Sequence, residues 1–258
     1  MFKELKNECI ITFDLITNGP LLIRSGDSSQ LDPTVPDIQF IKGVQDGKLK
    51  PVIPGSSIKG VFRSKIERIL YSIYECCDIF DKENNCRIKY KGKNGTERYN
   101  ESCPACKMFG NLGLKGRVQY KDSFAKNGYK LGKRSNVGID RITGASIKGA
   151  LFEPEVLEEG CFPCEIKLEN YFRWQIKLIV HVMNEINEGY VTFGSSTSRG
   201  FGNMKCEKLK VISKEFGDFE DSFYKINEYE VDELTEILKN TKIEKKEIEG
   251  VNLDGQAI

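Results

Sequence analysis

The stretch Pro51-Val-Ile-Pro-Gly-Ser-Ser-Ile-Lys-Gly-Val-Phe-Arg63 leads the chain from an extended segment through a Pro-Gly turn into a helix. From Ser57 to Tyr74, apolar residues recur at positions 58, 62, 66, 69 and 73. This is the spacing of an amphipathic helix, with one face directed at a core. The stretch therefore predicts a helix that packs on the rest of the domain.

The start of this helix has the chemistry of a phosphate-binding site. Ser56 and Ser57 offer hydroxyls beside free backbone N–H groups, and Lys59 and Arg63 are four residues apart on one face. Such a surface can hold a nucleic-acid backbone. The alternative is an ordinary helix with a serine cap and a solvated basic face.

Outward from this helix, the pattern predicts an α+β domain with one antiparallel sheet. Alternation predicts strands at Cys9–Ile16 and Gly116–Phe124. A period-2 stripe from Phe172 to Val182 predicts a further strand. Asp232 begins a helix of about nine residues. Arg24–Lys50 has few periodic signals, and its length indicates a functional loop.

Composition allows a substantial core, since 39% of the 258 residues are hydrophobic. No run is apolar enough to span a membrane and the N-terminus does not resemble a signal peptide, so we expect a cytoplasmic protein with no membrane partner. The charge is uneven. Residues 1–150 hold 26 Lys and Arg against 16 Asp and Glu, whereas residues 151–258 hold 13 against 22. An anionic partner would bind the basic front half.

Nine cysteines in such a compartment indicate metal ligands or buried thiols rather than disulfides. Cys103-Pro-Ala-Cys106 is a CxxC knuckle, and Cys77 and Cys86 precede it in a polar segment, with Cys76 as the alternative to Cys77. Two separated pairs of thiolates suit a structural Zn²⁺. Since residues 76–106 contain few apolar side chains, the metal would replace a core.

The sequence does not support several common catalytic mechanisms. Cys161-Phe-Pro-Cys164 opens a predicted strand, whereas a thioredoxin-like pair needs a helix there, so two half-buried thiols are favoured. The one histidine, His181, lies in the predicted strand 172–182 and excludes a two-histidine ribonuclease mechanism. No hydrolase, zinc-protease, Walker or Rossmann motif is present.

What remains for catalysis is a carboxylate with a divalent ion such as Mg²⁺ or Mn²⁺, acting on a self-reactive substrate. RNA is such a substrate, because its 2′-OH can attack the adjacent phosphate. Asp27, Asp32 and Asp37 lie in the long loop before the phosphate-binding helix. The first two have the character of turn residues. Asp37 precedes the apolar stretch Ile38–Ile41, which favours a fixed position.

Two further segments fit an RNA surface. The glycine-rich loop Gly194–Gly202 contains Arg199, Gly200 and Phe201, which allow close approach to phosphates and stacking on a base. Arg134–Arg141 is predicted to be a polar turn. Either segment alone could be a generic loop.

In this order the segments resemble the RAMP superfamily of CRISPR-associated proteins, and within it the backbone subunit of type III effector complexes. The resemblance covers nearly 200 residues. It rests on the acidic loop 32–42, the stretch 51–63, Cys103-Pro-Ala-Cys-Lys-Met-Phe-Gly110, Gly116-Arg-Val118, Val137-Gly-Ile-Asp-Arg-Ile-Thr-Gly-Ala145 and the loop 194–202. The cysteine insertion resembles zinc-bearing members of the III-D and III-E branches.

The resemblance implies an RRM-like (ferredoxin-like) core with an inserted zinc-binding lid and a thumb. Residues 1–215 would form this domain, with the lid at 76–106 and the thumb at about 125–160, and 216–258 would be an acidic extension. Members polymerise along a guide RNA beside other effector subunits, and active ones cut complementary target RNA. By position Asp37 would cut, with Asp32 as its rival.

The implied RNA-binding residues are Ser56, Ser57, Lys59, Arg63, Arg141, Arg199, Gly200 and Phe201. Two alternatives stay open. One is a structural subunit that binds the guide but does not cut. The other is a guide-processing endonuclease of the same superfamily.

Overall fold

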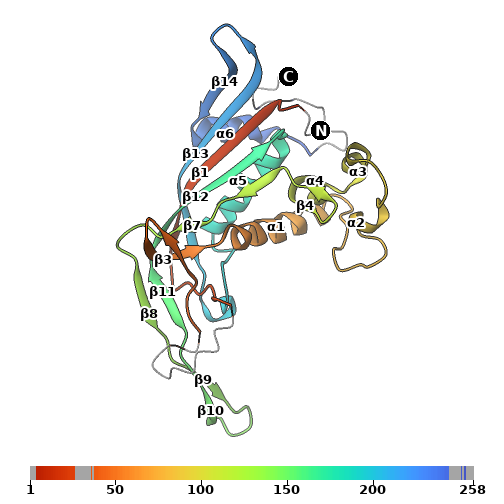
Figure 1. The fold of residues 1–258 in the computed structure, drawn as a ribbon. Helices are drawn as coiled ribbons and strands as arrows, with labels where there is room; N and C mark the ends of the chain where they lie inside the picture. Colours follow the sequence, from red (N-terminus) through yellow and green to blue (C-terminus); the bar gives the residue numbers. More distant parts are fainter. Residues whose placement is uncertain (1–3, 27–35, 37, 244–250, 252, 254–258) are drawn as a thin grey trace.

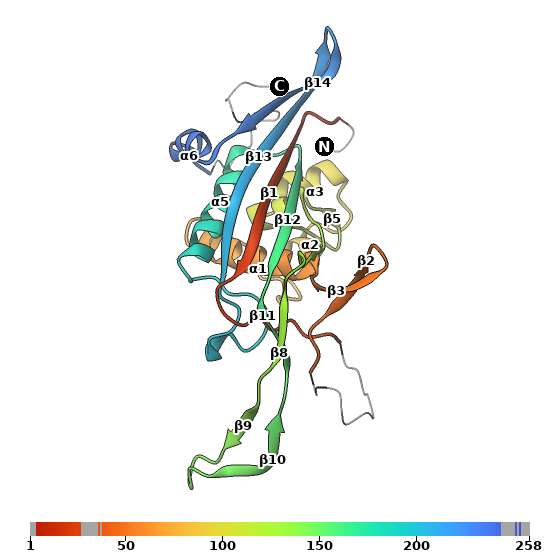
Figure 2. The same ribbon diagram turned by 90° about the vertical axis from the view of Figure 1, so that its left-hand side faces the viewer.

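The computed structural model describes residues 4–26, 36, 38–243, 251 and 253. A five-stranded antiparallel sheet, in the order β14-β13-β1-β12-β6, forms its centre (Figure 1). The strands are β1 (Asn7–Thr17), β6 (Val118–Tyr120), β12 (Cys161–Glu169), β13 (Met204–Phe219) and β14 (Ser222–Tyr229). Helices α1 (Gly55–Tyr71) and α5 (Arg173–Asn187) lie against one face, behind the strands in Figure 2. The predicted α+β class and antiparallel sheet are confirmed.

The central sheet is built from two β-α-β units. Along the chain the order is β1, α1, β6, then β12, α5, β13, and the strands of the two units alternate in the sheet. β1 lies between β12 and β13, with Ile11 opposite Ile166 and Val211. The N-terminal strand is therefore bonded along both edges, which fixes its register.

The core lies between the sheet and the two helices. Phe62 on α1 is fully buried, with its ring 6.4 Å from that of Phe13 and 5.7 Å from that of Tyr120. Ile58, Phe62 and Ile66 are buried as the spacing predicts, and Leu70 completes the buried face. Ile69 is only partly buried, and the helix ends at Tyr71, before the exposed Ile73. Each side chain of the buried face contributes about 1.5–3 kcal/mol by leaving water.

The prediction of a strand at 172–182 is wrong, because this segment forms α5. Its buried residues include Gln175, Ile179, Val182 and Ile186, which recur every three or four positions. The sheet, α1 and α6 (Val231–Lys239) all pack against α5, so most sides of this helix are apolar. Its apolar residues therefore alternate along the sequence by chance, which imitates the pattern of a strand. His181 is thus a helix residue, exposed beside Glu185.

The C-terminal segment continues the central sheet. The expected boundary at 215/216 falls inside β13, and β14 pairs with β13 as the fifth strand. The predicted helix at 232–240 is present as α6, where Leu234 and Leu238 are buried.

Part of the predicted loop 24–50 is ordered as a hairpin. β2 (Lys42–Gln45) pairs with β3 (Lys48–Ile53), and β3 also pairs with β7 (Ser123–Phe124). Asp46 and Gly47 make the turn with φ angles of 52° and 72°. An Asp-Gly pair with two positive φ angles is the signature of a tight hairpin, so the sequence does carry a signal for this turn.

The segment predicted to be a thumb forms a long ribbon that extends from the sheet at the end opposite β14 (Figures 1 and 2). Its inner part pairs β8 (Lys130–Lys133) with β11 (Glu155–Glu159), and its outer part pairs β9 (Asn136–Ile139) with β10 (Ser146–Phe152). The polar turn predicted at Arg134–Arg141 is therefore a strand over 136–139, and the turn begins at its end.

The cysteine-rich segment contains three short helices beside α1: α2 (Cys86–Lys89), α3 (Gly95–Glu101) and α4 (Pro104–Phe109). The small hairpin β4 (Gly110–Asn111) and β5 (Leu114–Lys115) follows. The remaining short element is the 3-10 turn η1 (Thr197–Arg199). Among the described residues, every helix is too short or too polar to cross a membrane.

Candidate nucleic-acid interface and metal site

The start of α1 is wedged against β6. Pro54 stands at the cap position, and the helix begins at Gly55, where a Cβ atom would lie 2.4 Å from the carbonyl oxygen of Tyr120. Asp122 accepts a hydrogen bond from the Gly55 backbone N–H at 2.7 Å. The cap is therefore supplied by a distant carboxylate, and the alternative of a serine cap is wrong.

The predicted cationic face is present on α1. Ser56 is exposed, and Ser57, Lys59 and Arg63 are half-buried. Arg63 bonds Glu67 through Nε at 2.7 Å and the Gly110 carbonyl through Nη1 at 3.2 Å. Lys59 has no ion pair within the part of the chain that the structure describes. Its pKa is lowered by burial and by the charge of Arg63.

This face can bind an anion beside the helix start rather than directly at it. The Asp122 carboxylate already occupies the Gly55 N–H and would repel a phosphate there. The hydroxyls of Ser56 and Ser57 lie on the turn that precedes Lys59, where the helix dipole still favours negative charge. Since Arg63 is paired with Glu67, Lys59 is the positive charge on this face that a phosphate can pair with.

The four predicted cysteines meet in one cluster. The Sγ atoms of Cys77, Cys86, Cys103 and Cys106 all lie within 4.8 Å of one another. Cys77 Sγ is 3.5 Å from Cys106 Sγ and 3.7 Å from Cys103 Sγ. Tetrahedral Zn²⁺ with bonds of about 2.3 Å separates its sulfur atoms by about 3.8 Å. The donor set and spacing therefore fit a metal ion such as zinc.

The sulfur atoms are hydrogen-bonded to one another and to one backbone N–H. The backbone N–H of Cys103 donates to Cys86 Sγ at 3.4 Å. Hydrogen bonds from Cys106 and other thiols lower the pKa of Cys103, whereas the hydrogen bond to Cys103 raises the pKa of Cys106. Cys76, the alternative ligand, is in contact with Cys103 but lies outside the group of four.

The second CxxC pair sits in β12, as predicted. Cys164 is buried, and burial raises its pKa to about 12. Cys161 is half-buried, and burial raises its pKa as well. Lys126 and Lys208 lie close to Cys161, but burial and the Asp14 carboxylate outweigh them and its pKa stays raised, whereas a reactive cysteine has a lowered pKa.

The loop 194–202 packs on the base of the ribbon. The ring of Phe201 is only 5% exposed and packs with Leu22 and Val156, so it is not free to stack on a base as predicted. Arg199 is exposed and lies over the Phe152 ring at 5.7 Å. Gly200 has a φ of 84° and open space around its Cα, which leaves its backbone accessible.

The other predicted RNA-binding and catalytic residues lie elsewhere. Arg141 is exposed in the turn between β9 and β10, where Asp140 accepts hydrogen bonds from the next residues. The hairpin of β9 and β10, which carries Arg141 in its turn, lies well away from α1 in Figure 1. Asp37 and Asp32 lie outside the described residues. The stretch after Asp37 is fixed, since Phe40 is buried and Ile38 bridges to Pro154 at the ribbon base.

Comparison with known proteins places these features in a family. The model of the RAMP superfamily matches residues 14–205. The chain belongs to the RAMP superfamily. It is 27% identical over 224 residues to the CRISPR system Cms endoribonuclease Csm3 of Methanocaldococcus jannaschii, covering 81% of this chain and 77% of that protein. It is also 27% identical over 191 residues to the Streptococcus thermophilus protein of the same name, covering 66% and 74%.

Three residues of this RAMP protein escaped the sequence analysis. Asp122, 67 residues from the helix that it caps, had no local signal. Arg87 and Asn111 line a pocket beside the cysteine cluster. Asn111 directly follows the Cys103–Gly110 motif, but only the folded chain brings it to the same pocket as Arg63.

Proposed function

We propose that this RAMP protein is a guide-RNA-binding backbone subunit of a type III CRISPR effector complex that cleaves complementary target RNA. The observation that carries the proposal is the 27% identity, over 81% of the chain, to a protein named a CRISPR endoribonuclease. Copies of the chain would line the guide, next to other subunits of the complex.

The strand order supports the RRM-like core that the proposal requires. With β1, β6, β12 and β13 numbered 1 to 4, the sheet reads 4-1-3-2 with helices after the first and third strands, which is the ferredoxin-like arrangement. The α1 face offers Lys59 and the serine hydroxyls to guide phosphates. Arg199 and Gly200 at the ribbon base, and Arg141 at its tip, would extend the contact.

The cysteine segment 76–106 is proposed as a lid held by Zn²⁺. Cys77, Cys86, Cys103 and Cys106 would hold the ion, which supplies structural cross-linking and no chemistry on RNA. The segment joins α1 to the sheet, so its order bears on the position of Arg63.

Cleavage is assigned to Asp37 with Mg²⁺ or Mn²⁺. Attack of the 2′-OH on the adjacent phosphate leaves a 2′,3′-cyclic phosphate and a 5′-OH, and the carboxylate would help to move the proton or hold the ion. The stretch that follows in the sequence, 38–41, is anchored at the ribbon base, and Asp37 itself is assigned from its place in the chain just ahead of α1.

The test is cleavage of complementary RNA by the assembled complex with Mg²⁺. Asp37→Ala is expected to reduce the rate by about 10²–10⁴-fold, the usual contribution of a positioned acid or base. Asp32→Ala is the matched control and should cleave nearly normally. Wild-type cleavage by Asp37→Ala would refute the assignment. A wild-type complex that binds but never cuts would identify a structural subunit.

A further inference from the structure

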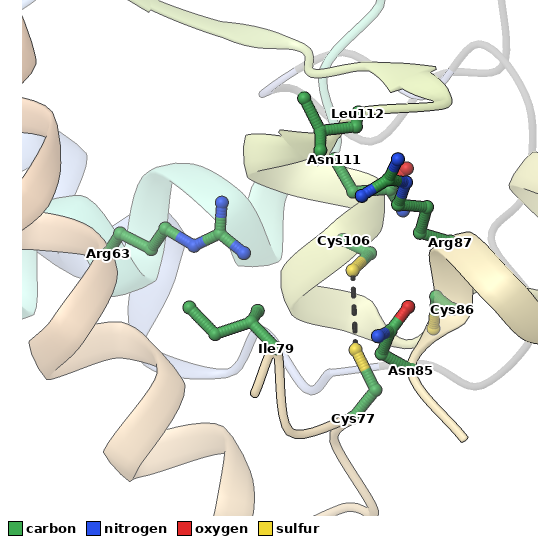
Figure 3. A pocket seen from close by; sticks show the side chains of 9 residues that line it. All are labelled: Arg63, Cys77, Ile79, Asn85, Cys86, Arg87, Cys106, Asn111 and Leu112. Atoms are coloured by element: carbon green, nitrogen blue, oxygen red, sulfur yellow. Dashed lines mark hydrogen bonds between the residues drawn. The ribbon is translucent and has the colours of Figure 1, made fainter. Parts of the chain in front are cut away.

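A pocket of about 240 Å³ lies between α1 and the cysteine segment (Figure 3). Arg63 reaches into it from α1, and Arg87 comes from α2 on the opposite side. Ile79, Asn111 and Leu112 complete the rim, and the thiols of the cysteine cluster form part of the wall. The volume is far larger than one metal ion needs, so the pocket extends beyond the metal site.

The pocket contains two polar groups that have no partner among the described residues, one buried and one open to water. Asn111 accepts a hydrogen bond from Gly113 N–H through Oδ1 at 2.8 Å, but its buried Nδ2 has no partner within the described residues. Arg87 is exposed and makes no hydrogen bond or ion pair there. A buried donor without a partner costs about 1–3 kcal/mol, which a ligand with an acceptor atom would recover.

Two residues of the rim are apolar. Ile79 is 51% exposed and Leu112 is 83% exposed, and both side chains line the pocket. Exposed aliphatic groups beside unpaired donors fit a ligand with flat apolar faces and acceptor atoms at its edge. A nucleobase has this form.

The charges around the pocket favour a base over a phosphate as its ligand. Four thiolates outweigh the two positive charges of Zn²⁺, so the loaded cluster remains anionic and disfavours a phosphate beside it. Arg63 is already paired with Glu67. A neutral base avoids this repulsion, and its amino and imino groups can donate toward sulfur.

We propose that this pocket binds an unstacked nucleobase of an RNA strand whose phosphates follow α1. Asn111 Nδ2 and the Arg87 guanidinium donate to acceptors on the base edge, and Ile79 and Leu112 contact its faces. The proposal rests on the RNA-binding function argued above. It assigns a base-recognition role to the cysteine segment.

The test uses full-length, zinc-loaded protein and two single-stranded oligoribonucleotides of equal length, one with bases and one abasic. Arg87→Gln should weaken binding of the base-containing RNA by about tenfold, the value of one hydrogen bond to a charged group, and leave the abasic RNA unchanged. Asn111→Ala should act in the same direction, and because it also removes the acceptor of the Gly113 N–H, its unfolding is measured beside its RNA binding. Lys91→Gln removes an equal charge from the same segment outside the pocket and is the control.

A direct readout is photo-crosslinking with RNA that contains 4-thiouridine, mapped by mass spectrometry. Crosslinks to the peptides that carry Ile79 or Leu112 are expected. Equal weakening of both RNAs by Arg87→Gln would show a phosphate contact and overturn the proposal, as would crosslinks confined to other peptides. If wild-type protein binds neither RNA, the proposed function itself fails.

Discussion

The sheet core and the cysteine segment obtain their order in different ways. In the core, α1 buries four apolar residues, one on each successive turn, and its Phe62 packs against β1 and β6. In the cysteine segment, α2 has four residues and α3 has seven, each begun by an asparagine cap at Asn85 and Asn94. Helices this short are unstable alone. The sheet core is therefore held by burial, whereas α2 and α3 depend on their caps and on the thiols of the cluster.

Removal of the metal should have the largest effect: the cysteine segment should lose its order while the sheet core stays folded. Structural zinc contributes about 10–16 kcal/mol of apparent binding free energy in small zinc domains, so its loss should unfold residues 76–106. Cys103→Ser, or chelation of the wild type, is expected to abolish zinc binding and to remove amide-exchange protection from α2 and α3 while β1 and β12 stay protected. Elemental analysis and hydrogen exchange measure both effects.

Cys76→Ser is the control for this experiment, because Cys76 lies beside the cluster but outside the group of four. It should keep one zinc per chain. Protection of α2 and α3 that survives complete metal loss would mean that caps and packing suffice.

A substitution in the core should instead destabilise the sheet and its helices. Phe62→Ala removes a fully buried ring that contacts Phe13 and Tyr120, and we expect a loss of about 3–5 kcal/mol in the free energy of unfolding. Denaturant unfolding measures the loss. Phe80→Ala, at a ring that is 84% exposed, should cost little. Equal losses for the two variants would contradict the assigned core.

The smallest expected effect concerns the α1 face. Lys59→Gln should lower the slope of log affinity for single-stranded RNA against log salt by about 0.7, the value for one phosphate contact. Because its pKa is lowered by burial and by Arg63, the Lys59 contribution is present below that pKa and is lost as pH rises through it, earlier than for a free lysine. RNA titrations at several salt concentrations and pH values measure both.

Arg68→Gln is the matched control, since Arg68 is exposed nine residues on, on the opposite side of α1. Its slope should equal that of the wild type. A Lys59→Gln protein with an unchanged slope would place the RNA elsewhere.

Local patterns predicted the parts that depend on neighbours in sequence. Most of the buried spacing of α1 and the strand β1 followed from periodicity, and the helix α6 followed from a helix-start signal at Asp232. The ligand set followed from the CxxC knuckle and the cysteines that precede it. The pattern failed at α5, because a helix covered on most sides has no polar stripe and its apolar residues can alternate by chance. The hairpin at Asp46-Gly47 was missed although its turn residues were visible.

The sequence by itself determined the amphipathic helix, the cationic residues on its face and the cysteine pairs, because spacing along the chain fixes which side chains share a turn or a knuckle. Only the tertiary structure decided that Asp122 caps α1, that Phe201 is buried and that Arg63, Arg87 and Asn111 share one pocket. These contacts join segments far apart in the chain. They depend on how the sheet and the cysteine segment pack around α1, which no local pattern encodes.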